Sequence, residues 1–224
     1  MPDLGFSITS VQPTLYTMAP QLTFKLLITN PSSQSIQSVA LRCQIQIETT
    51  KRQYSGTEQE GLLDLFGTAG RWGTTLKPLL WTNVNINVPA FDHSIGVDLD
   101  VPCSFDFNIA TTKYFGGLEG GQIPLNLMFS GTIFLENEEG LLQIEQISWN
   151  SETRFQLPVA VWKQMMDLNY PNSTWFCLRR DVFEKLNRYK TINSMPTWEE
   201  TIETLLRLDQ ASIEVFDDTS RTIA

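Results

Sequence analysis

The stretch Thr82-Asn83-Val84-Asn85-Ile86-Asn87-Val88 is the most regularly alternating part of the sequence, with apolar and amide side chains at every second position. Successive side chains of a β-strand point to opposite faces of a sheet, so this pattern predicts a strand with one buried and one solvated face. Pro89 follows directly and predicts that the strand ends there. Strands that are wet on one face are typical of antiparallel sheets, whereas parallel sheets are buried on both faces.

The same alternation recurs on both sides of this strand. It is present in residues 6–11, 22–28, 39–47, 97–101, 103–109 and 141–149. Residues 123–135 carry apolar side chains on both faces, which predicts a central or covered strand. Turn residues separate these segments at short intervals, so the part before residue 156 predicts an antiparallel β-sandwich of about eight to ten strands.

Beyond residue 156 the apolar spacing becomes helical. Pro158 fits the first turn of a helix that carries Trp162 and Met165, and a second helix is expected from a cap at Asp181 to about Ile192. Thr197 begins a capping box for a third helix. The fold class is therefore mainly β (α+β), with a C-terminal cluster of about three helices.

This pattern predicts three parts of the chain. Residues 1–156 form the sandwich, residues 157–208 form a helical extension packed on it, and residues 209–224 form an acidic, flexible tail.

Charge and cysteine content limit the function classes. The net charge of −9, from 16 basic and 25 acidic residues, argues against nucleic acid or an anionic membrane as the main partner. No apolar stretch approaches the ~18 residues of a membrane span, and the start lacks signal-peptide features, so a soluble cytoplasmic protein is expected. Cys43, Cys103 and Cys177 lack zinc or disulfide spacing and are expected to be buried thiols.

Few residues offer catalytic chemistry. His93 is the single histidine, so sites that need several histidines are excluded. It lies in a turn-like segment. No metal or cofactor is expected. Asp98 and Asp100 share one strand face and are interpreted as a solvated surface that discourages edge pairing. Pairs drawn from Glu119, Glu136, Glu138 and Glu145 leave a carboxylate-dependent hydrolase open as an alternative.

Five side chains are the candidate ligand- or partner-binding residues. Gly67, Gly70 and Gly73 precede a strand and lack the lysine ending of a phosphate-binding loop, so they are expected to form a surface loop. Arginine and aromatic residues are enriched at protein interfaces, and the candidates on this loop and on a second expected loop are Arg71, Trp72, Trp81, Tyr114 and Phe115. An equal alternative is that Trp72 folds back over the sandwich end while Arg71 pairs with an acidic neighbour.

Two segments carry a resemblance to a known family. Residues 71–81, with Arg71-Trp72 and Thr75-Leu76-Lys77-Pro78-Leu79-Leu80-Trp81, and residues 175–183, followed by Tyr189-Lys190 and Pro196-Thr197-Trp198, resemble an uncharacterised bacterial family of unknown function. The resemblance covers most of residues 3–208. It implies an association with nickel-iron hydrogenase gene clusters and hence an accessory or assembly role, and it supplies no binding residues.

These observations favour a non-catalytic accessory or protein-interaction β-sandwich over an enzyme. A carbohydrate- or small-ligand-binding sandwich is the first alternative, because aromatic platforms beside Asn and Asp suit sugars. The hydrolase is the second. The expected partner is another protein, and the apolar strand at residues 123–135 leaves a homo-oligomer open.

Overall fold

The computed structural model describes residues 3–104, 108–136, 140–173 and 178–208. The chain divides into two compact units, residues 1–174 and 175–224, and each is described by itself. The domain boundaries expected from the sequence stay a prediction. Cys177, the strand expected at Phe105 and Phe107, the tip of the 136–140 turn and the acidic tail lie outside the described residues.

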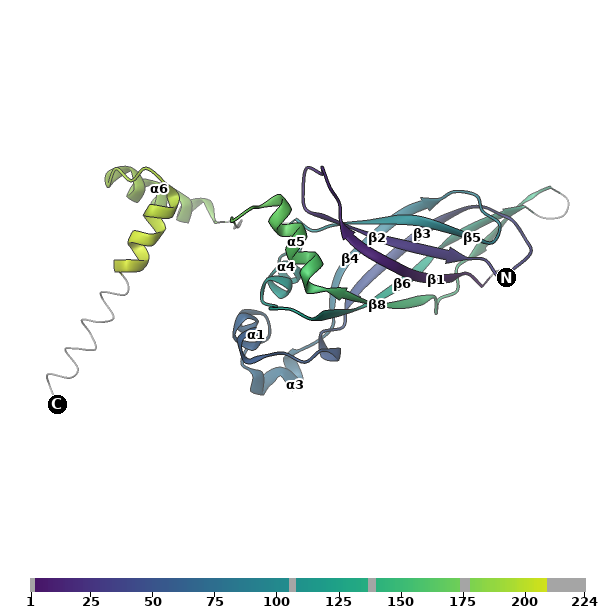
Figure 1. Ribbon diagram of the computed structural model, residues 1–224, viewed down its shortest axis with the longest axis horizontal. Helices are drawn as coiled ribbons and strands as arrows, with labels where there is room; N and C mark the ends of the chain where they lie inside the picture. The colour runs from purple at the N-terminus through teal and green to yellow at the C-terminus, as the bar shows by residue number, and fades with distance from the viewer. Residues whose placement is uncertain (1–2, 105–107, 137–139, 174–177, 209–224) are drawn as a thin grey trace. The chain divides into compact units, whose positions relative to one another are not determined.

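The first unit is built on two antiparallel sheets, as the alternating sequence predicts (Figure 1). The smaller sheet has the order β1-β2-β5, formed by Gly5–Pro13, Gln21–Thr29 and Ser94–Pro102. The larger sheet begins β4-β3-β6, formed by Leu79–Val88, Ile36–Ile47 and Gln122–Glu136. Two further strands both pair with the long β6, namely β7 (Leu142–Gln146) and β8 (Glu152–Pro158). The eight strands of the described residues confirm the predicted mainly β fold.

The core lies between the apolar faces of the two sheets. Leu22, Phe24, Leu26 and Ile28 of β2 are buried at alternating positions, and β3 contributes the same pattern from Val39 to Ile47. Strand β6 is central, with β3 on one side and β7 and β8 on the other, which confirms the first of the two positions predicted for it.

A β-bulge explains why β4 departs from strict alternation at its start. Thr82 pairs with Ile45 and Leu80 pairs with Gln46, so Trp81 is the additional residue on this strand. A bulge lets two adjacent residues face the same side of a sheet. Trp81 and Thr82 are accordingly both buried, while the exposed Asn83, Asn85 and Asn87 resume the predicted alternation.

Short helices gather at one end of the sandwich (Figure 1). They are α1 (Gly56–Gly61), α2 (Leu63–Phe66), α3 (Trp72–Thr75), α4 (Ile109–Gly116) and α5 (Val159–Asn169). Helix α5 confirms the helical spacing after Pro158.

Two predicted loops are wrong. The glycine-rich segment forms the 3₁₀ turn η2 (Ala69–Arg71) and α3, and Gly67 is its one glycine with positive φ, at 71°. The expected loop at Tyr114 and Phe115 is helix α4. Ile109 begins that helix and does not continue a strand, because the Asn108 side chain accepts a hydrogen bond from Thr111 N at 3.0 Å and caps the first turn.

The second unit contains α6 (Arg180–Ile192) and helical residues 198–208, and with α5 these helices confirm the predicted C-terminal cluster. The expected cap at Asp181 is wrong, because the helix begins at Arg180, two residues earlier than predicted, with Arg179 at the cap position and Asp181 in the first turn. The cap at Thr197 is confirmed by a hydrogen bond of 3.1 Å from Glu200 N to its Oγ1. Phe183 of α6 lies against Trp198, with ring centroids 5.3 Å apart.

Candidate functional site

The structure separates the five predicted binding residues. Arg71 is exposed and Trp72 is half-buried, whereas Trp81, Tyr114 and Phe115 are only 3%, 0% and 1% exposed. The three buried aromatic residues belong to the core and present no surface to a partner in this conformation. As binding residues the five stay a prediction, and Arg71 alone is fully at the surface.

Trp72 is fixed at the end of the sandwich by specific contacts. Its Nε1 donates a hydrogen bond to Gly67 O at 2.9 Å, and its ring packs edge-on against Tyr54 and Phe66, with centroids 5.1 and 6.1 Å away. This arrangement corresponds to the folded-back alternative for Trp72. Arg71 differs from that alternative, because none of the described carboxylates forms an ion pair with it.

Two tyrosines connect this end to the core. The hydroxyl of Tyr54 donates to Thr49 O at 2.7 Å and lies 2.9 Å from the hydroxyl of Tyr114. Since the Tyr54 proton is committed to Thr49, Tyr114 is the donor between the two phenols. Burial raises the pKa of both hydroxyls above the ordinary value, so both stay neutral near pH 7.

A buried ion pair between Arg52 and Glu58 is the most strongly bonded polar group of this end. The side chains are 9% and 5% exposed. Glu58 also accepts from Glu119 N at 2.9 Å and from Ser55 N at 3.2 Å. Burial would raise the pKa of Glu58, but these backbone bonds and the Arg52 charge outweigh it and lower the pKa below the usual value.

Arg52 extends this pair to the segment before β6. Its Nη1 donates to Gln122 O and its Nη2 to Gly120 O, both at 2.8 Å. The pair therefore joins α1 to residues 119–122, which are more than 60 positions away in sequence. The sequence pattern does not indicate this ion pair, although Ser55 and Glu58 have capping-box spacing and the box is formed. With their oxygens and most of their N–H groups engaged, the two residues act as a structural clamp.

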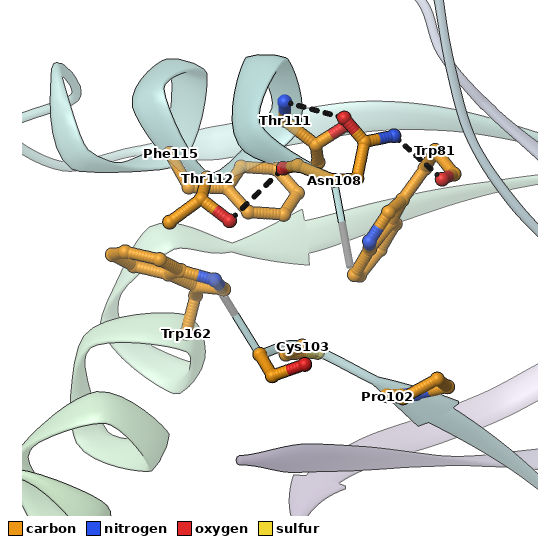
Figure 2. Close-up of a pocket in the computed structure, with 9 residues that line it drawn as sticks. Trp81, Pro102, Cys103, Asn108, Thr111, Thr112, Phe115 and Trp162 are labelled. Carbon is orange, nitrogen blue, oxygen red and sulfur yellow. Dashed lines mark hydrogen bonds between the residues drawn. The ribbon is translucent and has the colours of Figure 1, made fainter. Parts of the chain in front are cut away.

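A small, partly open pocket lies where α4, α5 and the start of β4 meet (Figure 2). Its volume is about 10 Å³, and Trp81 and Phe115 of the predicted set line it together with Cys103, Thr111 and Trp162. Burial raises the pKa of the Cys103 thiol to about 12, so this side chain is a neutral, inert wall of the pocket. The sequence could not indicate this pocket, because its walls come from four separated segments.

The carboxylates considered for catalysis are bonded to different partners. Asp98 pairs with Lys25 at 2.8 Å, and Asp100 accepts from Thr23 Oγ1 at 2.6 Å. Glu119 accepts from Ser55 Oγ at 3.0 Å. Within the described part of the chain, no three His, Cys, Asp or Glu side chains gather as metal ligands.

The second unit exposes apolar side chains that a folded domain would normally bury. Val182, Phe183, Ile192, Leu205 and Leu206 are between 36% and 73% exposed; we call them the C-terminal apolar side chains. Among residues 178–208, Thr201 is the one buried side chain, and it is not hydrophobic. Residues 179–192 also carry five basic and two acidic side chains.

The fold and these features define a two-sheet antiparallel sandwich protein with an amphipathic helical unit at its C-terminus. The chain belongs to a family of unknown function, DUF6084, whose model matches residues 1–214. No curated protein sequence matches the chain. None of the described helices has the length and apolar character needed to cross a membrane.

Solved structures resemble the chain only loosely. A putative late embryogenesis abundant protein has 16% identity over 70% of this chain and 73% of its own, with a TM-score of 0.30. The putative ApaA protein of Bordetella pertussis has 13% identity over 70% of this chain and 95% of its own, with a TM-score of 0.27. A protein of Archaeoglobus fulgidus has 13% identity, covers 67% and 97% of the two chains and has a TM-score of 0.26.

Proposed function

We propose that this protein is a non-catalytic interaction protein that binds another protein through its C-terminal helical unit. The observation that supports this proposal is the exposure of the C-terminal apolar side chains in a unit whose described residues bury no hydrophobic one. Short helices draw most of their stability from packing an apolar face against something else. A partner surface that covers this face would supply that packing.

The charge of α6 indicates which kind of partner surface would complement it. With Arg179 and four further basic side chains against two acidic ones, residues 179–192 suit an apolar groove with an acidic rim. An anionic membrane is disfavoured, because Glu199, Glu200 and Glu203 on the following helix would be repelled by it. The helix-in-groove mode of recognition fits both the spacing of Val182 and Leu186 and this charge.

The resemblance noted in the sequence suggests where to seek this partner. A gene context shared with nickel-iron hydrogenases would make a hydrogenase subunit or maturation factor the first protein to test. The protein would then act in the bacterial cytoplasm as an assembly partner of that metalloenzyme.

The test replaces exposed apolar side chains of the helical unit in the full chain. Ile192→Asp and Leu206→Asp are expected to abolish capture of the partner and to leave the thermal melting of the chain unchanged, because both side chains are solvent-exposed. Leu142→Asp is the matched control, since Leu142 is 66% exposed, between Leu206 and Ile192, but lies in β7 of the first unit. Binding should weaken as salt rises.

Two outcomes would contradict this proposal. In the first, the variants retain every partner of the native chain. In the second, hydrogen exchange shows the amides of α6 strongly protected in the isolated protein, which would mean that the chain itself already covers this face. Binding to anionic vesicles with the same sensitivity to Ile192→Asp would assign the face to a membrane.

Arg71 offers a second surface for the same function. It is exposed, and Leu63 and Leu80 of the first unit are also about half exposed. Arg71→Ala tests this surface without disturbing Trp72, whose hydrogen bond to Gly67 O is structural. Retention of all partners by Arg71→Ala would remove it as a candidate.

A groove beside α5 favours small-ligand binding as a second candidate function. Its volume is about 410 Å³, within the usual range for ligand sites, and Gln12, Lys25, Asp98 and Gln164 are among its lining residues. A thermal-shift screen against glycans tests it, because a ligand at one hundred times its Kd adds ~2.7 kcal/mol of stability. No shift with any glycan, or the same shift in Gln164→Ala, would argue against this candidate.

A further inference from the structure

Three polar groups that make no hydrogen bond to the described residues line the pocket between α4, α5 and β4, and one of them, the Thr111 hydroxyl, is fully buried. Thr111 is 2% exposed, and its Oγ1 is buried and unpaired. Trp81 and Trp162 are 3% and 7% exposed, and neither indole N–H donates to any of the described residues. Trp72 differs, because its indole N–H is paired with Gly67 O.

Buried polar groups in native proteins are nearly always paired, either with protein atoms or with ordered water, because an unpaired group loses its hydration without compensation. The buried, unpaired hydroxyl of Thr111, beside two indole N–H groups that the described residues leave without an acceptor, therefore indicates that the pocket is not empty. Figure 2 shows Trp81 and Trp162 on opposite sides of this space, with the nitrogen edge of each ring turned toward it and Thr111 on α4 above.

The size and lining of the pocket restrict what can fill it. Its volume of about 10 Å³ is close to the ~10–15 Å³ needed for a single water. No Lys, Arg or His lines it, so a buried anion would lack a countercharge. Two further polar side chains of the lining are already occupied, since Asn108 Nδ2 donates to Trp81 O at 2.9 Å and Thr112 Oγ1 donates to Asn108 O at 3.1 Å.

We propose that this pocket is a binding site for one structural water molecule. The water accepts hydrogen bonds from the indole N–H groups of Trp81 and Trp162 and donates one to Thr111 Oγ1. Three bonds are the usual number for a buried water. The water thereby joins the bulge of β4, the first turn of α4 and the middle of α5. These three segments are far apart in the sequence.

The substitution Thr111→Val distinguishes a hydrated pocket from a dry one by the sign of its effect. Valine has the shape of threonine without the hydroxyl. If the water is present, Thr111→Val removes one of its bonds and lowers the folding equilibrium constant by about 2- to 10-fold. If the pocket is dry, valine replaces an unsatisfied hydroxyl and the constant rises, which would overturn the proposal. Thr57→Val, at an exposed position of α1 in the same unit, calibrates the same change on a solvated helix.

Two direct measurements complete the test. A high-resolution crystal structure of the full chain should show one oxygen-sized peak about 2.7–3.2 Å from Thr111 Oγ1 and from both indole nitrogens. Magnetisation transfer from water to the Trp81 and Trp162 indole protons should be present in the native protein and weakened in Thr111→Val. An empty pocket, an anion in it, or transfer unchanged by Thr111→Val would each overturn the assignment.

Discussion

Replacing Glu58 by glutamine tests whether the ion pair with Arg52 holds α1 to the segment before β6. Glutamine keeps the size of the side chain but leaves the Arg52 guanidinium buried and without its counterion. Breaking a buried pair in this way typically costs about 3–5 kcal/mol. For a unit of this size, a loss of about 3 kcal/mol lowers Tm by roughly 6–12 °C.

Urea unfolding followed by circular dichroism measures this loss directly. The matched control is Asp64→Asn, which removes the carboxylate of the exposed pair with Lys113 and should cost at most about 1 kcal/mol. The double variant Arg52→Met, Glu58→Gln should lose less than the sum of the two single losses, because neither charge is then stranded. A loss below about 1 kcal/mol for Glu58→Gln, or strict additivity, would refute the reasoning.

The remaining predictions concern pH, backbone space and thiol reactivity. The pKa of Glu58 is lower in the folded than in the unfolded chain, so its ionised form stabilises the fold fully above the unfolded pKa of about 4.3, and this stability is lost as pH falls through the folded pKa. The free energy of unfolding should therefore fall less steeply with acid in Glu58→Gln than in the native chain. Identical slopes in the two proteins would contradict this. Gly131→Ala should prevent folding or cost more than about 3 kcal/mol of stability, because φ at Gly131 is +145° and a Cβ would overlap the Ala40 carbonyl. Gly96→Ala is the control and should change stability little, because a Cβ there faces open space. Equal losses for the two variants in denaturant melts would count against the β3–β6 register. Burial raises the pKa of the Cys43 and Cys103 thiols to about 12. In a Cys177→Ser chain, neither thiol should therefore react with a thiol reagent at pH 8 until the protein unfolds. Rapid labelling of this variant in its folded state would disprove the burial of the two thiols.

The strands and their faces follow from the sequence because burial of one face imposes a period of two. Residues 22–28, 39–47 and 83–88 show this directly. The alternation misleads at Ile109, because the cap formed by Asn108 is a local interaction that begins a helix regardless of the preceding pattern. It also hides the bulge at Trp81, since a bulge depends on the register of a strand 35 positions earlier.

The candidate site is less predictable from the sequence than the fold. Aromatic residues near expected loops suggested an interface, yet Tyr114 and Phe115 are packed in the core through α4. The contacts of Arg52 with Gly120 and Gln122 join segments whose proximity only the tertiary structure establishes. A capping box at Ser55 was the one local signal that could have indicated α1 and directed attention to Glu58.

Strand β6 has a consequence for how the protein is made. Its partners are β3, which begins at Ile36, and β8, which ends at Pro158, so its hydrogen bonds reach across most of the first unit. During synthesis β3 and β4 can pair only with each other until β6 has left the ribosome, and the larger sheet is complete only after β8 has followed. Such non-local pairing is typical of domains that fold in milliseconds to seconds, and it exposes two apolar strands to chaperones in the interval.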